Sequence, residues 1–153
     1  MPTTINGPEQ LKALAGKELG SSEWRVMDMA RIRKFAEATG DHQWIHVDEE
    51  RARRESPYGG PIAHGYLTLS SIAGQFSEVV KYSGFKLVVN YGTNKVRFPN
   101  PLKAGDRFRL TLKMGEVKPV NEWWEAVFNA AIEVEGQAKP SCAAECIYRF
   151  LPA

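Results

Sequence analysis

The longest helical pattern in the chain is YLTLSSIAGQFSEVVKY, residues 66–82. Its apolar residues recur at intervals of three and four, which places them on one face of a helix. Ser83-Gly84 follows directly and is expected to end this helix. An apolar face of this length must pack against a matching surface, so the rest of the fold should supply one. The face consists of Leu69, Ile72, Ala73, Phe76, Val79 and Val80.

The sequence after this helix alternates between apolar and polar residues, as half-buried strands do. The turns between the alternating segments are too short to hold crossover helices, so the strands should pair antiparallel. One long helix followed by an antiparallel sheet is an α+β arrangement, with the helix on the apolar face of the sheet. About five strands are predicted, at residues 86–90, 93–98, 107–114, 124–134 and 142–150.

Shorter helical segments precede the long helix. One is expected at residues 8–15, where Gly16 ends it. A second begins after Asp28, a typical N-cap residue, and closes at Gly40. A third is capped by Asp48 and runs to about residue 55.

The composition excludes several classes of protein. The chain has 153 residues and 17.1 kDa, which predicts one domain over residues 1–153. The net charge of +2 supplies no broad field for nucleic acid or for an anionic membrane. The N-terminus lacks the basic flank and apolar core of a signal peptide, and no stretch approaches the ~20 apolar residues of a membrane span. We therefore expect a cytoplasmic protein that binds neither nucleic acid nor membrane.

The two cysteines, Cys142 and Cys146, are expected to be buried in the core. They have the same parity on one predicted strand, so about 13 Å separates them at ~3.3 Å per residue. That distance is too long for a disulfide between them.

All three histidines of the chain, His42, His46 and His64, fall within 23 residues, together with Asp41. In an irregular loop after a helix-ending glycine, Asp41 and His46 can turn into one cleft. A carboxylate and an imidazole together can hold a water molecule and move its protons. The competing interpretation is a solvated loop with incidental histidines.

Gly65 precedes the long helix, whose N-terminus offers unpaired N–H groups and partial positive charge. Such groups can stabilise an oxyanion. An ordinary turn glycine is the alternative, and this observation alone favours it.

A metal site is a rival use of the same residues, because His42 and His46 are four apart and Asp41 or His64 could complete it. No further ligand motif supports it, so no metal is expected. The glycine-rich motifs of dinucleotide and nucleotide sites are missing too, and no cofactor is expected.

Two blocks of sequence carry a resemblance to a known family. FAEATGDHQWIHVD, residues 35–48, and PIAHG, residues 61–65, resemble the hydratase-2 motif of the MaoC-like dehydratases. NYGTNKVRF, residues 90–98, is similar to the strand that follows the central helix in that family. The likeness extends over about residues 20–150 and is closest to the nodulation-protein-N-like group of (3R)-hydroxyacyl-CoA dehydratases.

The resemblance implies a hot-dog fold, an antiparallel sheet wrapped around one long helix, and a homodimer. It implies reversible hydration of a trans-2-enoyl-CoA to a (3R)-hydroxyacyl-CoA without a cofactor. In the matching positions Asp41 and His46 are the catalytic pair, and the Gly65 amide is the oxyanion donor. The further substrate-binding positions are Gln43, Ala63, His64, Asn94 and Arg97.

One departure from the family motif concerns Gln43 and Trp44, which stand where the family often has Asn-Pro. Gln43 still offers an amide to the pair, whereas Trp44 is expected to reshape the mouth of the pocket. Lys95, Arg97 and Lys103 are candidates for binding the nucleotide of CoA, with solvated strand ends as the alternative.

Two other functions fit the same resemblance. Hot-dog proteins also hydrolyse acyl-CoA, so a thioesterase is the nearest rival. A non-catalytic acyl-CoA-binding protein is the second. The thioester partner is expected to be acyl-CoA, with acyl-carrier protein as an alternative carrier.

Overall fold

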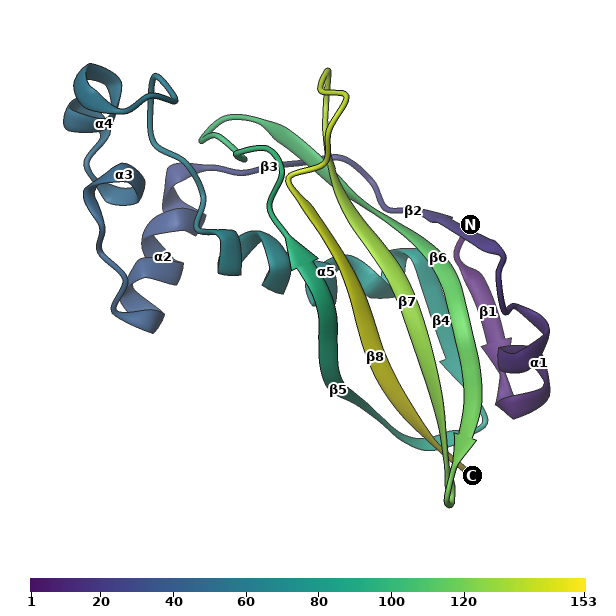
Figure 1. The fold of residues 1–153 in the computed structure, drawn as a ribbon. Coiled ribbons are helices and arrows are strands. Elements are labelled where there is room, and N and C mark those ends of the chain that lie inside the picture. The colour runs from purple at the N-terminus through teal and green to yellow at the C-terminus, as the bar shows by residue number, and fades with distance from the viewer.

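The computed structural model describes residues 1–153 and contains a six-stranded antiparallel sheet (Figure 1). The strand order is β2-β6-β7-β8-β5, and the short β3 also pairs with β6. The strands are β2 (Glu18–Ser21), β3 (Arg25–Val26), β5 (Phe85–Arg97), β6 (Arg107–Val120), β7 (Trp123–Val134) and β8 (Cys142–Pro152). The predicted antiparallel sheet is confirmed for the second half of the chain.

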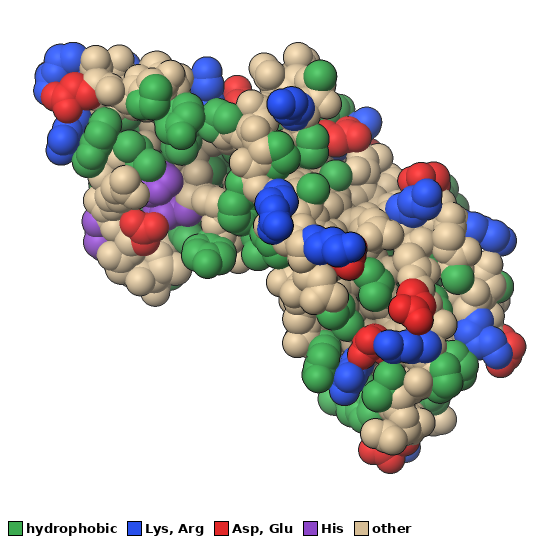
Figure 2. Space-filling view, viewed as in Figure 1, with side chains coloured by type: hydrophobic (Ala, Val, Ile, Leu, Met, Phe, Trp, Pro, Cys, Tyr) green, Lys and Arg blue, Asp and Glu red, His purple; other side chains and the backbone are tan.

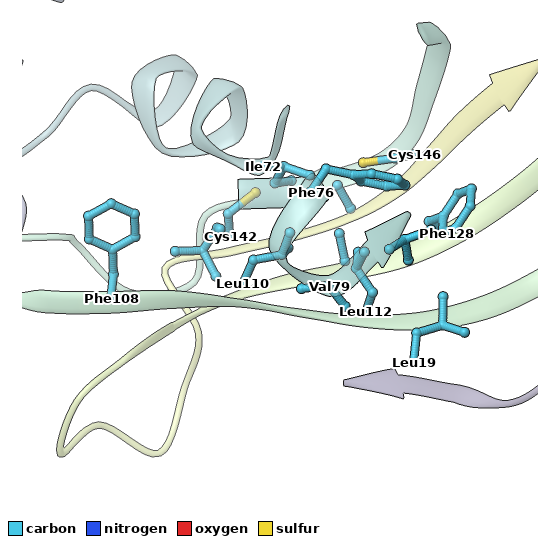
Figure 3. Packing of buried hydrophobic residues seen from close by; sticks show 14 of the residues in the cluster. Leu19, Ile72, Phe76, Val79, Phe108, Leu110, Leu112, Phe128, Cys142 and Cys146 are labelled. Atoms are coloured by element: carbon cyan, nitrogen blue, oxygen red, sulfur yellow. The ribbon is translucent and has the colours of Figure 1, made fainter. Parts of the chain in front are cut away.

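The long helix α5 (Gly65–Val79) lies across one face of this sheet (Figure 1). It contributes Ile72, Phe76 and Val79 to the core, and alternate residues of β6, β7 and β8 face it (Figure 3). Phe128 of β7 is fully buried and its ring lies 5.0 Å from that of Phe76. Every second residue on the strands is therefore buried against residues that recur every three or four positions on the helix. Both spacings are the ones that the sequence patterns predicted. Cys142 and Cys146 lie in this core as free thiols, as expected (Figure 3).

The prediction for the end of the long helix was wrong. The helix ends at Val79, and residues Val80–Ser83 form strand β4. β4 pairs in parallel with β1 (Thr3–Asn6). Neither strand was predicted, and their pairing means that not all strands of the chain are antiparallel. β-branched Val80 favours an extended backbone, and the pairing lets it stay buried.

Two predicted strands, at 86–90 and 93–98, form the single strand β5. Its register against β8 shifts at three places, and one of them, between Asn90 and Gly92, falls in the gap between the two predicted strands. The short strands β2 and β3 were also not predicted, because few residues pair there and no alternation marks them.

We call residues 28–64 the helical arm, because Figure 1 shows them extending beyond the end of the sheet at the start of α5. Its helices are α2 (Met29–Thr39), α3 (Trp44–Val47) and α4 (Glu49–Glu55). The predicted caps are confirmed: Asp28 accepts from the Arg31 N–H at 2.8 Å, and Gly40 has a φ of +80°. The loop predicted around residues 41–46 instead holds the single turn of α3.

The first helix of the chain, α1 (Gly7–Ala13), lies at the opposite end of the molecule (Figure 1). It overlaps the helix predicted at 8–15 and ends slightly earlier. None of the helices combines the length and the apolar character needed to cross a lipid bilayer.

Candidate active site

The turn α3 places His46 in the interior of the helical arm, where only 6% of the residue is exposed. Its Nδ1 lies 2.7 Å from the carbonyl oxygen of Ile62. A carbonyl oxygen only accepts hydrogen bonds, so Nδ1 carries the hydrogen and the free lone pair of the neutral ring is on Nε2. His46 is therefore oriented as a proton acceptor through Nε2.

His64 immediately precedes α5, and its ring stacks on that of His46 with 3.9 Å between centroids and 23° between planes. Its Nε2 lies 2.9 Å from the backbone carbonyl oxygen of Asp41 and donates to it. The other ring nitrogen, Nδ1, is buried and has no hydrogen-bond partner. His64 thus joins the two sequence blocks of the site, since it touches residues of the first block and precedes Gly65 of the second.

Asp41 follows the glycine that closes α2, and its side chain is exposed. Its Oδ1 accepts from the Gln43 N–H at 3.3 Å, which turns the chain into α3. One donor atom each from Asp41, His46 and His64 lies within 4.8 Å of the others. Figure 2 shows histidine and carboxylate side chains reaching the surface of the arm, where the outline of the molecule is indented toward the sheet.

The pKa of His46 is lowered from its usual value of 6.5. Burial is the largest cause, and the neighbouring His64 lowers it further. The hydrogen bond to Ile62 and the charge of Asp41 raise the pKa of His46, but together they do not offset the two effects that lower it. Near neutral pH His46 is therefore an uncharged base.

Gly65 is the first residue of α5, so its N–H has no acceptor one turn earlier in the helix. The ring of Phe98 packs against it: a Cβ on Gly65 would lie 2.9 Å from Phe98 Cε2. A cavity of about 350 Å³ adjoins both residues and is also lined by Ala63 and Thr68. Glycine is thus needed here for close approach, and the first residue of α5 borders this cavity.

The other predicted substrate-binding residues lie in different surroundings. Gln43 contacts Asp41 through its backbone N–H, and Ala63 is buried and donates its N–H to the Leu102 oxygen at 2.7 Å. Asn94 and Arg97 lie exposed on β5, where Arg97 donates to the carbonyl oxygen of Val96.

The three candidate cations for the CoA nucleotide are all exposed, and Lys95 and Arg97 lie on the same strand, β5. Lys95 forms an ion pair with Glu145, at 3.4 Å. Lys103 pairs through its backbone with Ile62, close to the histidines.

Two residues that contact the site, Ile62 and Phe98, were not predicted to do so, although both lie inside the motifs quoted above. Their apolar side chains did not indicate that the Ile62 carbonyl oxygen would bond His46 or that the Phe98 ring would pack on Gly65.

Two further cavities lie farther along α5. A cavity of about 150 Å³ is lined by Leu69, Ala73, Asn90 and Tyr148 among others. A larger cavity of about 550 Å³ shares Ala73, Asn90 and Tyr148 and extends to Val80. Residues 65, 69 and 73 lie along one stripe of α5, so Leu69 and Ala73 line these cavities from the side of the helix that carries Gly65.

Comparison with known proteins identifies the fold and the family. A monoamine oxidase regulatory protein from Archaeoglobus fulgidus superposes with a TM-score of 0.81, covering 100% of this chain and 99% of that one, at 20% identity. An (R)-hydratase from A. caviae superposes with a TM-score of 0.71 at 20% identity, covering 90% of this chain and 96% of that one. At such identity the likeness establishes the fold, which is the hot-dog fold.

Sequence relatives are closer. A 3-hydroxyacyl-thioester dehydratase Z from Mycobacterium tuberculosis is 43% identical over 149 residues, covering 97% of this chain and 98% of the relative. Nodulation protein N from Rhizobium meliloti is 41% identical over 140 residues, covering 90% and 86%. The sequence pattern of the MaoC-like domain matches residues 10–134. The chain therefore belongs to the MaoC-like dehydratase family.

Proposed function

We propose that the protein is a hydro-lyase that interconverts a (3R)-3-hydroxyacyl thioester and the trans-2-enoyl thioester, with acyl-CoA as the carrier. Family membership supports this, as does the M. tuberculosis relative, which is similar over nearly the full length of both chains. The observation that carries the proposal is the position of His46. Its buried ring has one nitrogen within 4.8 Å of an Asp41 carboxylate oxygen, and it stacks on His64, which directly precedes α5.

The chemistry requires both parts of this arrangement. The β-carbon of an enoyl thioester accepts a hydroxyl only if the thioester oxygen can take negative charge. The Gly65 N–H, aided by the partial positive charge of the helix N-terminus, stabilises that oxygen. Asp41 and His46 hold the water, take one of its protons as the oxygen bonds to C3, and deliver a proton to C2. The two residues act as one unit, and the reverse sequence removes water.

The acyl chain extends from Gly65 along α5 toward the cavities lined by Ala73 and Tyr148. This path keeps an apolar chain against the helix and leaves the thioester at the histidines. Lys103 and Arg97 are exposed, and Lys103 pairs through its backbone with Ile62; these two are the cations for the nucleotide of CoA.

A second copy of the chain covers β5. This strand is at the edge of the sheet and none of its 13 residues is buried, although Leu87 and Tyr91 are large and apolar or aromatic. A long unpaired edge of this kind is normally protected by pairing. We expect light scattering to give the mass of a dimer, and a mass near the 17.1 kDa of one chain would contradict this.

The test of the activity is spectrophotometric hydration of crotonyl-CoA by Asp41→Asn and His46→Gln. Each change removes one acid–base group, so turnover should fall about 10²- to 10⁴-fold while the circular dichroism spectrum is unchanged. His42→Gln is the matched control, because His42 is exposed and lies between the two residues in sequence. Near wild-type hydration by both dyad variants would overturn the assignment.

The same assay separates the rivals. Loss of the enone absorbance with formation of the (R)-alcohol supports hydration. Release of free CoA from a saturated acyl-CoA would instead indicate a thioesterase. Binding of acyl-CoA without any turnover would indicate a non-catalytic protein.

A further inference from the structure

We propose that the N-terminal strand β1, acting through β4, fixes the far end of the acyl pocket and limits the substrate to acyl chains of up to about 17 carbons. This inference rests on the proposed function, because it concerns the acyl chain of the same thioester. β4 lies beside β1, at the end of α5 away from the helical arm (Figure 1). The histidines lie at the other end of α5, so the limit is set by a part of the molecule that takes no part in the proton transfers.

The far end of the larger cavity is formed by β4. Three consecutive residues of this strand, Val80, Lys81 and Tyr82, line the cavity of about 550 Å³. We call residues 80–82 the end wall. The ring of Tyr82 packs edge-on against that of Phe150 on β8, with 5.8 Å between centroids and 88° between planes. Tyr82 therefore borders the cavity and also contacts the sheet, so its ring closes the path of a chain that runs along α5.

The extended conformation of the end wall depends on β1. The spacing of apolar residues in 66–82 is helical and favours continuation of α5. The backbone instead becomes extended at Val80, with φ of −131° and ψ of 130°. β1 and β4 form a separate two-stranded sheet, so β1 is the strand that pairs with residues 80–83. Three residues span about 10 Å as a strand and about 4.5 Å as a helix, so loss of this pairing would displace Tyr82 from the cavity.

β1 is itself anchored in the rest of the protein. Ile5 is fully buried in the main hydrophobic core. The hydroxyl of Thr3 donates to the carbonyl oxygen of Leu19 on β2, at 2.9 Å. In the parallel pairing Ile5 lies opposite Tyr82. β1 therefore acts as a fixed template for β4.

The length of α5 determines which chains reach the end wall. Ala73 lies about 12 Å along the helix from Gly65 and Val80 about 22 Å from it, at ~1.5 Å per residue. A hydrocarbon chain with bonds of ~1.5 Å advances about 1.3 Å per carbon. A thioester at Gly65 thus needs about 9 carbons to enter the larger cavity and about 17 to meet the end wall. Each CH₂ beyond the wall stays in water and forgoes roughly fourfold in affinity.

The experiment measures kcat/KM for the trans-2-enoyl-CoA substrates crotonyl-, dodecenoyl-, hexadecenoyl- and eicosenoyl-CoA, each below its micelle-forming concentration. In the wild type kcat/KM should rise with length as far as hexadecenoyl-CoA and rise no further for eicosenoyl-CoA. Tyr82→Ala removes the ring from the end wall. Thr4→Pro disrupts the pairing with β4, because proline lacks the N–H and fixes φ at about −65°. Both changes should raise the eicosenoyl-to-hexadecenoyl ratio at least about fourfold, the effect of one further buried CH₂.

Two conservative variants are the matched controls. Tyr82→Phe retains the ring, and Thr4→Ala retains the backbone N–H of an exposed residue, so both should keep the wild-type ratio. A general loss of stability lowers kcat/KM for all four substrates alike, so the ratio reports on the end of the pocket. Tyr82→Ala leaves β1 unaltered and remains informative if Thr4→Pro does not fold.

An unchanged ratio in Tyr82→Ala would overturn the end wall, as would a wild-type kcat/KM that continues to rise at eicosenoyl-CoA. A raised ratio in Tyr82→Ala together with a wild-type ratio in folded Thr4→Pro would overturn the role of β1.

Calorimetric binding of the saturated acyl-CoA series separates this inference from the proposed function. If no enoyl-CoA is hydrated but the Kd values show the same length limit and the same shift in Tyr82→Ala, the proposed function fails and the end wall stands. If crotonyl-CoA is hydrated and neither ratio moves, the reverse holds. Absence of both turnover and binding would remove both.

Discussion

Different interactions stabilise the two regions of the molecule, the sheet with α5 on one side and the helical arm on the other. On β7 every second residue from Ala126 to Val134 is buried, and the core around it is almost entirely apolar. The arm buries Ile32, Ala36 and Ala52, but its interior also contains two histidines in contact. The sheet therefore derives its stability from removal of apolar surface from water. The arm depends on caps and on hydrogen bonds to named carbonyl oxygens, which is what a site of polar groups requires.

This contrast matters for function, because polar contacts position groups in one orientation whereas apolar packing only fills volume. His46 is fixed by one carbonyl oxygen and one stacked ring. Small changes in the arm should therefore alter activity more than stability, and changes in the sheet should do the opposite.

The largest expected effect is on stability, from Phe128→Ala in the sheet. Phe128 is fully buried against Phe76, Tyr148 and Phe150, so its loss leaves a cavity and should cost about 3–5 kcal/mol of unfolding free energy. Phe98→Ala is the matched control beside the arm, since Phe98 is 44% exposed. Urea denaturation of both variants measures the difference. Equal losses for the two variants would remove the distinction between the regions.

Gly65→Ala should reduce activity and leave the fold intact. The added Cβ meets the ring of Phe98 at 2.9 Å, and that ring is exposed enough to move outward. The displacement alters the space in which the thioester oxygen must sit, so kcat/KM should fall about 10- to 100-fold.

The double variant Gly65→Ala, Phe98→Ala provides the control for this steric explanation. It should regain part of the lost activity, because removal of the Phe98 ring removes the clash, and the backbone N–H of residue 65 is present in every variant. Wild-type kcat/KM in Gly65→Ala alone would show that the N-terminus of α5 has no part in the reaction.

Much of the fold follows from periodicity in the sequence. The faces of α5, β6, β7 and β8 were predictable because each buries a regular set of residues against one layer. β4 was not predictable in this way, because Val80–Ser83 continues the helical spacing and becomes extended only through pairing with β1, some 77 residues earlier. The β-branched Val80 is only a weak local signal, and the non-local pairing decides the outcome.

The structure brings together three residues of the candidate site that the sequence singled out, but nothing in the sequence indicated their contacts. Asp41 and His46 are separated by five residues, and the sequence placed them together with His64 and Gly65 by resemblance. The hydrogen bonds that orient them come from the backbone carbonyls of Ile62 and Asp41, and a carbonyl is present at every residue. Only the folded chain selects which of these carbonyls the histidines meet.

The smallest expected effect is a loss of folding stability at acidic pH that comes from His46 in the helical arm and not from the sheet. The contributions to the His46 pKa partly cancel, but the net direction is downward from 6.5. Above that pH the ring is neutral whether the chain is folded or not. As the pH falls below it, the unfolded chain binds the proton first, so the folded state loses stability until the lowered pKa of the folded state is passed. Urea denaturation at about pH 7.5 and about pH 5.5 should show this loss in the wild type and less of it in His46→Gln.

In the sheet, the three groups with shifted pKa values are shifted upward, away from the acidic range. Burial raises the pKa of Cys142 to about 12, of Cys146 to about 11 and of Tyr148 to about 12. These groups stay protonated throughout the acidic window, so they contribute nothing to a difference between the wild type and His46→Gln there. A loss of the same size in both proteins would assign the acid sensitivity to residues other than His46, and the arm would then not be the part of the molecule that responds to pH.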